Sequence, residues 1–248
     1  MIRYLLIMLA GIAAITAAAL AQAAGDRDRQ TSSYTLSEQR PSRSTSERFV
    51  FDYVNPDDPQ AKPPAVRRVV TILPRGGRFD VSVPGSCTAS DAELTAKGGA
   101  ACPPGSAVGG GVVTVDTGAP GPGRFVTADV EFFNNATDPD GELIFLNTVR
   151  GTEARTVIRT DSAPRRGTSE LGMLPGTPPD GGAIDTVDIH VDNVSREIGG
   201  ELRHYITTPP VCRGRKGDRH WTGRVQFTYA DGVTQTVPTH TPCRGRAR

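Results

Sequence analysis

Apolar and polar residues alternate in short runs along most of this chain, and Gly- and Pro-rich segments separate the runs. Runs of this kind, rich in Val, Ile, Phe and Tyr and bounded by turn residues, are typical of β-strands. The pattern predicts strands over residues 49–54, 66–73, 79–83, 112–115, 125–133, 143–149, 156–159, 187–191, 202–206, 221–229 and 233–237. Residues 162–182 are rich in Pro, Gly and Arg and are predicted to be irregular.

The last two runs form the clearest predicted hairpin. Trp221, Val225, Phe227 and Tyr229 fall on one face by period two. Residues 230–232 carry the Asp-Gly signal of a hairpin turn. We therefore expect a closing antiparallel pair at the end of the domain.

One short helix is predicted among the strands. Ser90-Asp91-Ala92-Glu93 is a capping box, in which Ser90 caps the first turn and Glu93 reaches back. Gly98 and Gly99 then end the helix. Many short strands with a single helix predict an all-β fold. We expect a single antiparallel β-sandwich, jelly-roll or Ig-like, with one short helix in a disulfide-closed loop.

The first residues have the features of an export signal. Arg3 precedes an uncharged apolar run from Tyr4 to Leu20, and Ala21-Gln22-Ala23 fits the small-x-small cleavage pattern. An uncleaved membrane anchor is the alternative, because the run is near the shortest length that spans a bilayer. The predicted organisation is a signal peptide over 1–23, a disordered polar leader over 24–46, the β-sandwich domain over 47–244 and a basic tail over 245–248.

The charges of the predicted mature chain are balanced. The sequence has 28 Lys and Arg against 27 Asp and Glu, and removal of Arg3 with the signal leaves 27 of each. A neutral chain argues against general binding of nucleic acid. No second apolar run of spanning length follows the signal, so no membrane span is expected after cleavage.

The four cysteines allow three disulfide pairings. We expect the two local ones, Cys87 with Cys102 and Cys212 with Cys243, in an oxidising compartment outside the cytosol. The alternative is metal binding, but no CxxC or CxxH spacing is present.

The regions around these cysteines resemble a group of exported, uncharacterised proteins from high-GC Gram-positive bacteria. The resemblance rests on the stretch from Cys87 through Ser90-Asp91-Ala92-Glu93-Leu94 to residues 101–109, followed by 115–118. The terminal run with Cys212, Trp221, residues 227–232 and Thr241-Pro242-Cys243 is similar to their C-terminal end. The resemblance covers most of the predicted domain. It implies export and a shared fold with two local disulfides, and it carries no assigned activity and no catalytic residues.

Candidate catalytic and metal-binding groups are few. Asp188, His190 and Asp192 share one face of a predicted strand, where they are a weak metal candidate or simply the solvent face of a half-buried strand. No GxSxG elbow and no HExxH motif occurs, and the four histidines are scattered through the last quarter of the chain. Because catalytic triads are defined by geometry, convergence in space stays open.

Basic residues gather at the second cysteine pair. If Cys212 and Cys243 are bonded, seven cations meet at one end of the domain and predict contact with an anionic partner, against a solvated loop and frayed tail as the alternative. They are Arg213, Arg215, Lys216, Arg219, Arg244, Arg246 and Arg248. The single tryptophan, Trp221, either anchors the core of the hairpin or stacks on a sugar.

These features favour a secreted or cell-envelope-associated, extracellular protein with a non-enzymatic binding or structural role, an unknown ligand and no cofactor. Its expected partner is an anionic cell-envelope polymer or another envelope protein. Two alternatives stay open. One is an extracellular hydrolase with a site assembled from His190, His204 or His220 and a carboxylate. The other is a carbohydrate-binding jelly roll, which needs an aromatic-lined groove.

Overall fold

A computed structural model describes residues 28–136, 141–163, 168–172, 181–212 and 219–245. The chain forms an 11-stranded antiparallel sheet in the order β1-β2-β10-β5-β6-β7-β8-β9-β3-β14-β15. Its strands are β1 (Gln30–Leu36), β2 (Glu47–Tyr53), β3 (Val66–Ile72), β5 (Ala107–Asp116), β6 (Phe125–Asn135), β7 (Glu142–Val149), β8 (Arg155–Ala163), β9 (Thr168–Gly172), β10 (Ala183–Val191), β14 (His220–Tyr229) and β15 (Thr234–Pro242).

Two small antiparallel sheets complete the fold. They pair β11 (Ser195–Ile198) with β12 (Glu201–His204), and β13 (Ile206–Thr207) with β4 (Arg78–Phe79). Within the described part of the chain, α2 (Asp91–Lys97) is the single α-helix, beside the short 3-10 turns η1 (Gly98–Ala101) and η2 (Gly121–Gly123). The all-β prediction with one short helix is confirmed.

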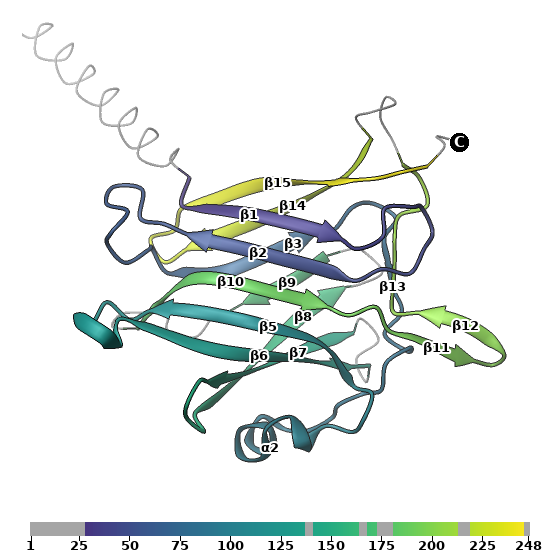
Figure 1. The fold of residues 1–248 in the computed structure, drawn as a ribbon, viewed down its shortest axis with the longest axis horizontal. Helices are drawn as coiled ribbons and strands as arrows, with labels where there is room; N and C mark the ends of the chain where they lie inside the picture. Colours follow the sequence, from purple (N-terminus) through teal and green to yellow (C-terminus); the bar gives the residue numbers. More distant parts are fainter. Residues whose placement is uncertain (1–27, 137–140, 164–167, 173–180, 213–218, 246–248) are drawn as a thin grey trace, which may run out of the picture.

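The large sheet folds over on itself, so that its two halves form two layers (Figure 1). Strands β1, β2, β10, β5 and β6 lie in front, and β3, β9 and β8 lie behind them. Phe51 of β2 packs against Phe227 of β14, with ring centroids 5.5 Å apart and planes at 87°. The core therefore lies between two halves of one continuous sheet, and assignment to a jelly-roll or Ig-like type stays a prediction.

The prediction of a disordered leader over 24–46 is wrong for residues Gln30–Leu36. Residues Gln30–Leu36 form β1, which pairs along its whole length with β2. Tyr34 and Leu36 are buried, and Thr241 Oγ1 of β15 donates to the Tyr34 carbonyl over 3.2 Å. The order comes from pairing with a distant strand, which outweighs the polar composition of the segment. The β domain thus begins before residue 47.

Two further predicted segments, 79–83 and 162–182, differ from the structure. The strand expected over 79–83 is only β4 (Arg78–Phe79), because the chain turns at Asp80, whose carbonyl accepts from Val83 over 3.0 Å. The segment 162–182, expected to be irregular, contains β9, which pairs with both β8 and β3.

The predicted helix is confirmed in detail. Ser90 caps α2, Glu93 N donates to Ser90 Oγ over 3.3 Å, and the Glu93 carboxylate accepts from Ser90 N over 2.9 Å. Gly98 ends the helix with a positive φ of 64°. The single buried side chain of α2, Leu94, seats it against the sheet beside the Cys87–Cys102 disulfide.

Both predicted disulfides are confirmed. Cys87 bonds Cys102 across 15 residues of sequence, and Cys212 bonds Cys243 across 31. Cys87 and Cys212 are fully buried. The second bond joins the segment before β14 to the end of β15 and packs beside Trp221.

Removal of either disulfide is expected to destabilise the domain. From loop length, replacing Cys212 and Cys243 by alanine should lower the free energy of unfolding by about 4 kcal/mol. The Cys87 and Cys102 double variant should lose about 3 kcal/mol. Urea unfolding followed by Trp221 fluorescence measures both, and a loss below about 1 kcal/mol in either variant contradicts this account of the braces.

Candidate functional site

A cavity of about 110 Å³ lies between the two layers of the sheet. Its walls are mainly aliphatic and aromatic, with a few polar groups. The lining residues are Glu47, Phe49, Phe51, Val69, Thr71, Leu73, Phe79, Val81, Phe132, Glu142, Leu143, Phe145, Thr160, Ile189, Val191 and Tyr205.

The strand period explains why these residues meet. Successive side chains of a strand point to opposite faces, so every second residue of a strand lies on the interior face. On β2 this face carries Glu47, Phe49 and Phe51. On the neighbouring β10, Ile189 pairs with Phe49 and Val191 pairs with Glu47, so the interior faces of these two strands of the front layer are in register.

Glu47 is the unusual member of this lining. Glu47 is only 4% exposed, and Tyr34 Oη donates a hydrogen bond of 2.8 Å to its Oε1. No other side chain in the described ranges hydrogen-bonds or ion-pairs with its carboxyl group. Burial raises the pKa of Glu47 from its ordinary value of 4.5 to about 7, against a lowering by the Tyr34 hydrogen bond. An acidic group that titrates near neutrality therefore lies at the wall of an apolar cavity.

Two tyrosines share the surroundings of Glu47. The pKa of the Tyr34 phenol is raised well above its ordinary value by burial, then by the charge and hydrogen bond of Glu47. The pKa of Tyr205, which also lines the cavity, is raised by burial and by Glu47. Both phenols are therefore neutral hydroxyl groups at physiological pH.

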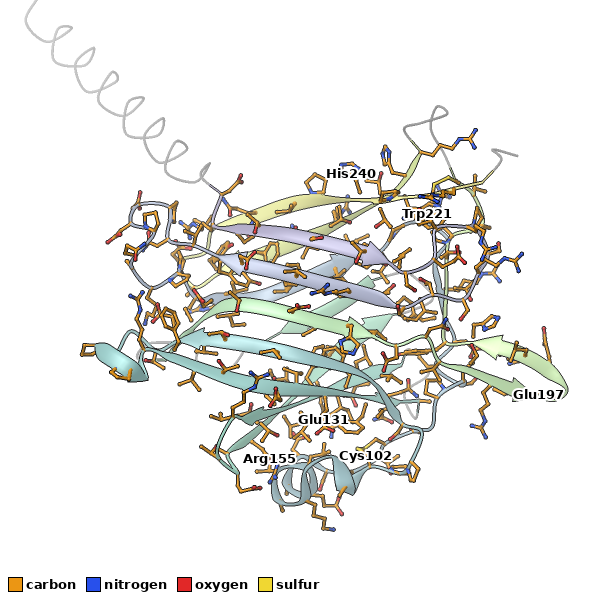
Figure 2. The ribbon with its side chains drawn as sticks, in the orientation of Figure 1. Cys102, Glu131, Arg155, Glu197, Trp221 and His240 are labelled. Atoms are coloured by element: carbon orange, nitrogen blue, oxygen red, sulfur yellow. A yellow bond between two sulfur atoms is a disulfide. The ribbon has the colours of Figure 1, made fainter. Side chains whose placement is uncertain are left out.

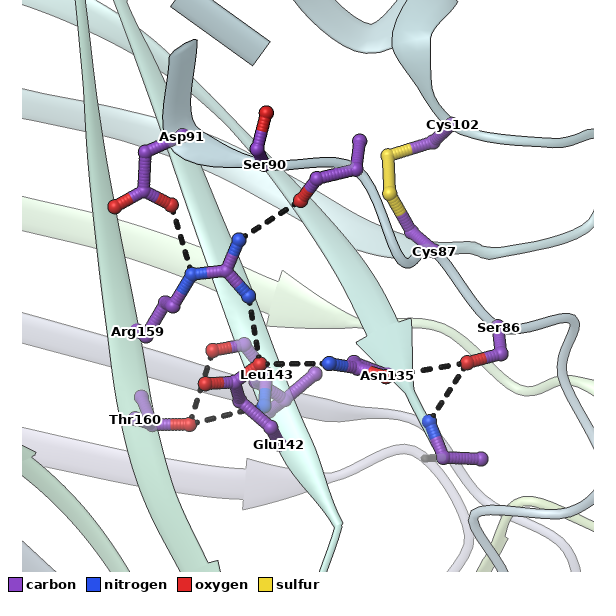
Figure 3. A network of polar contacts seen from close by, with 12 residues as sticks. Ser86, Cys87, Ser90, Asp91, Cys102, Asn135, Glu142, Leu143, Arg159 and Thr160 are labelled. Carbon is purple, nitrogen blue, oxygen red and sulfur yellow. Dashed lines mark hydrogen bonds and ion pairs between the residues drawn. A yellow bond between two sulfur atoms is a disulfide. The ribbon is translucent and has the colours of Figure 1, made fainter. Parts of the chain in front are cut away.

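A second carboxylate lines the cavity but is well compensated. Glu142 Oε2 accepts from Arg159 Nη1 over 2.8 Å and from Asn135 Nδ2 over 2.8 Å (Figure 3). Arg159 Nε also donates to Asp91 Oδ1 of α2 over 2.8 Å, and its Nη2 donates to the Ala89 carbonyl over 2.9 Å. This network ties the helix-bearing disulfide loop to β7 and β8, so Glu142 has a structural use that Glu47 lacks.

The Asp188, His190 and Asp192 face is exposed to solvent. Arg48 occupies the Asp188 carboxylate with two hydrogen bonds of 2.6 and 2.8 Å. His190 Nε2 lies 3.6 Å from Asp192 Oδ1, and both side chains are about half exposed. Within the described ranges, no group of three or more His, Cys, Asp or Glu side chains could hold a metal ion.

The histidines considered for a hydrolase lie in separate places. His204 Nδ1 is 2.8 Å from Ser195 Oγ on the β11–β12 hairpin, which projects from the sheet (Figure 1). Among the residues that the structure describes, no carboxylate is bonded to His204. His220 and His240 pack edge to face on β14 and β15, with ring centroids 4.9 Å apart. The fold therefore brings His220 and His240 together, while His190 and His204 lie on other elements.

Five of the seven cations proposed to meet an anionic partner lie outside the described residues. They are Arg213, Arg215, Lys216, Arg246 and Arg248. Of the other two, Arg219 donates to the Gly245 carbonyl, and the backbone N–H of Arg244 donates to the Gln39 carbonyl over 2.7 Å. The disulfide brings Cys212 and Cys243 together as expected, and the anionic-partner hypothesis stays a prediction.

Trp221 belongs to the core and does not offer an open ring face. Only 4% of the residue is exposed, and its indole Nε1 donates to the Val211 carbonyl over 2.8 Å. A hollow of about 460 Å³ lies beside it. The other lining residues of this hollow are Pro74, Arg75, Gly76, Pro210, Val211, His220 and Thr222. Figure 2 places Trp221 and His240 at one end of the molecule, and Cys102 with α2 at the other. Stacking of a sugar on Trp221 is not supported.

Sequence reasoning missed Glu47 as a site residue. Glu47, Phe49, Phe51 and Tyr53 follow one period-two series, and the predicted strand began two residues too late to include the first. Extending the series by one step places an acidic residue on an otherwise aromatic interior face. An acid in that position is the signal that could have found it.

Comparisons with known proteins identify no relative. No family model matches the chain, and no curated protein or solved structure is significantly similar to it. The resemblance to exported bacterial proteins therefore stays a prediction. Among the residues that the structure describes, no helix has the length and apolar character needed to cross a membrane.

Proposed function

We propose that this protein is a non-enzymatic binding protein that holds a small, largely apolar ligand between the two layers of its sheet. The observation that carries the proposal is the cavity of about 110 Å³, walled by Phe49, Phe79, Phe132 and Phe145 and containing the buried carboxyl of Glu47. Native cores are close-packed, so a void of this size needs a reason. For scale, an engineered apolar cavity of about 150 Å³ binds benzene.

The chemistry of the lining favours binding over catalysis. The lining contains no Cys, His, Lys or Ser, and the carboxyl groups of Glu47 and Glu142 hydrogen-bond with Tyr34, Asn135 and Arg159 and not with either threonine of the lining. These sixteen described residues therefore hold no hydroxyl or thiol nucleophile of Ser, Thr or Cys that is hydrogen-bonded to a base. The apolar walls supply affinity, and the few polar groups supply orientation, as in small-molecule sites generally. We place the protein outside the cytosol, secreted or at the cell envelope. The two disulfides, which persist in oxidising compartments, support this location.

Filling the cavity is expected to abolish binding without unfolding the domain. Thr71 lies on β3 and lines the cavity, and a phenylalanine in its place would occupy the space that a ligand needs. Toluene serves as the neutral probe, and saturation-transfer NMR on the wild type should show transfer to it. We expect Thr71→Phe to lose this signal.

The adjacent residue provides the matched control. Val70 lies on the same strand, next to Thr71, and is absent from the lining, as the alternation of the strand requires. Val70→Phe should keep the toluene signal, with circular dichroism confirming that both variants are folded. A folded wild type that binds neither toluene nor a close analogue of it, or a folded Thr71→Phe variant that retains the wild-type signal, would overturn the proposed function.

A further inference from the structure

We infer that the ligand of this cavity carries an ammonium group, and that the Glu47 carboxylate is its partner. The inference rests on the proposed function and deepens it, because it names the ligand as a small apolar or aromatic amine. It is carried by the position of one acidic side chain in an otherwise apolar, aromatic wall.

The first argument is the missing countercharge. Glu47 is buried, and its one side-chain partner among the described residues is the neutral hydroxyl of Tyr34. The one other buried carboxylate among the described residues has a cation nearby: an oxygen of Asp116, which is 1% exposed, lies 2.8 Å from Arg124 Nη2. A buried charge is costly unless it is paired. A cationic ligand would therefore supply the countercharge that the protein itself does not provide for Glu47.

The second argument is the sign of the charge on the residues that line the cavity. Its ionisable groups are Glu47, Glu142 and Tyr205, and the sixteen residues include no Lys, Arg or His. Arg159 already neutralises Glu142 from outside the lining. The remaining uncompensated group is acidic, so the cavity disfavours an anionic ligand and favours a cationic one.

The third argument is the aromatic wall. Five phenylalanines and Tyr205 surround the space, and Phe132 and Phe145 pack with centroids 4.4 Å apart. Aromatic faces attract ammonium groups, and the attraction is strongest where water is excluded. The same rings supply apolar contact area for the uncharged part of an amine. One ligand class thus satisfies both kinds of group in the lining.

The groups that face Glu47 leave its ionisation free to respond to a ligand. From β1 it meets Tyr34, from the segment before β13 it meets Tyr205, and across the cavity lies Glu142. Arg78 of β4 lines an adjoining small hollow with Glu47, and the structure records no ion pair between these two described residues. His190, next in sequence to the β10 partner of Glu47, is on the exposed face.

Because the pKa of Glu47 is about 7, an amine that needs its carboxylate should bind more tightly as the pH rises through that value. The binding-competent fraction increases about 30-fold between about pH 5.5 and about pH 8. Benzylamine is the probe, with toluene and benzyl alcohol as neutral analogues of similar shape. Titration calorimetry and NMR at both pH values measure the three affinities in the wild type and in Glu47→Gln.

We expect benzylamine to bind at least about 10-fold more tightly than toluene at the higher pH, and to lose this advantage at the lower pH and in Glu47→Gln. Toluene should bind equally in both proteins at both pH values. If toluene binds and benzylamine gains nothing over it, or if Glu47→Gln keeps the gain, the ammonium inference is wrong and the proposed function stands. If neither compound binds the folded wild type, the proposed function itself fails.

Discussion

Replacing Gly111 by alanine is expected to lower the free energy of unfolding by more than about 4 kcal/mol. Gly111 lies in β5, and a Cβ atom built on it would stand 2.1 Å from the Asp188 carbonyl oxygen and 2.6 Å from the Ile189 Cα of β10. Its φ of 154° is also one that residues with side chains rarely adopt. The obstructing atoms are backbone atoms of a paired strand, so relief requires β5 and β10 to separate.

Gly123→Ala is the matched control for this prediction. Gly123 has no atom within 4 Å of a built Cβ and lies in the exposed turn η2. We expect that variant to unfold within about 0.5 kcal/mol of the wild type. Chemical denaturation of both variants measures the difference. A stable Gly111→Ala protein would show that β5 and β10 do not approach as closely as described.

Replacing Glu47 by glutamine is expected to stabilise the domain at alkaline pH. The pKa of Glu47 is about 7 in the folded protein and 4.5 ordinarily. Below pH 4.5 the carboxyl is protonated in both states and has no effect. As pH rises towards 7 the folded state binds more protons than the unfolded state, so stability falls. Above pH 7 the full penalty, about 3 kcal/mol, applies.

Glu47→Gln removes this titration, and the amide oxygen can still accept from Tyr34. The stability difference between variant and wild type should therefore grow by about 3 kcal/mol from about pH 4 to about pH 8.5. Glu142→Gln is the control, because it weakens an ion pair with Arg159 and should bring no alkaline gain. A difference for Glu47→Gln that does not change with pH would mean that its carboxyl is not buried as described.

Local signals in the sequence predicted the local structure well. The capping box at Ser90, the glycine end at Gly98 and the period-two face of β14 each depend on residues close together in the chain. The two disulfides also join near neighbours, and both were predicted. These features can be predicted from the sequence because the interactions that stabilise them lie within about one helical turn or one hairpin.

The missed elements are those whose stability comes from distant partners. β1 reads as polar sequence, yet it is ordered by β2 and by contacts with β15 at the far end of the chain. β9 interrupts a Pro- and Gly-rich segment and is held between β8 and β3. Cross-strand pairing supplies the stabilisation here, and one sequence does not reveal which strands will be neighbours.

The candidate site was hidden for the same reason. The histidines are the obvious catalytic candidates in the sequence, but His190, His204 and His220 lie on separate elements of the structure. Glu47 becomes distinctive only when β3, β10 and the Tyr205 segment enclose it. Its chemistry arises from burial, which depends on the folding of the whole sheet.

The location of a bound probe tests the central claim most directly. With benzylamine in excess at about pH 8, where Glu47 is mostly ionised, intermolecular NOEs should connect the ring protons of the ligand to methyl groups of Val69, Leu143 and Val191. The same experiment on Thr71→Phe should lose them. NOEs to Val211 and Trp221 instead would place the ligand in the other hollow. That result, or the absence of any NOE with a folded wild type, would contradict the account of a ligand site between the two layers.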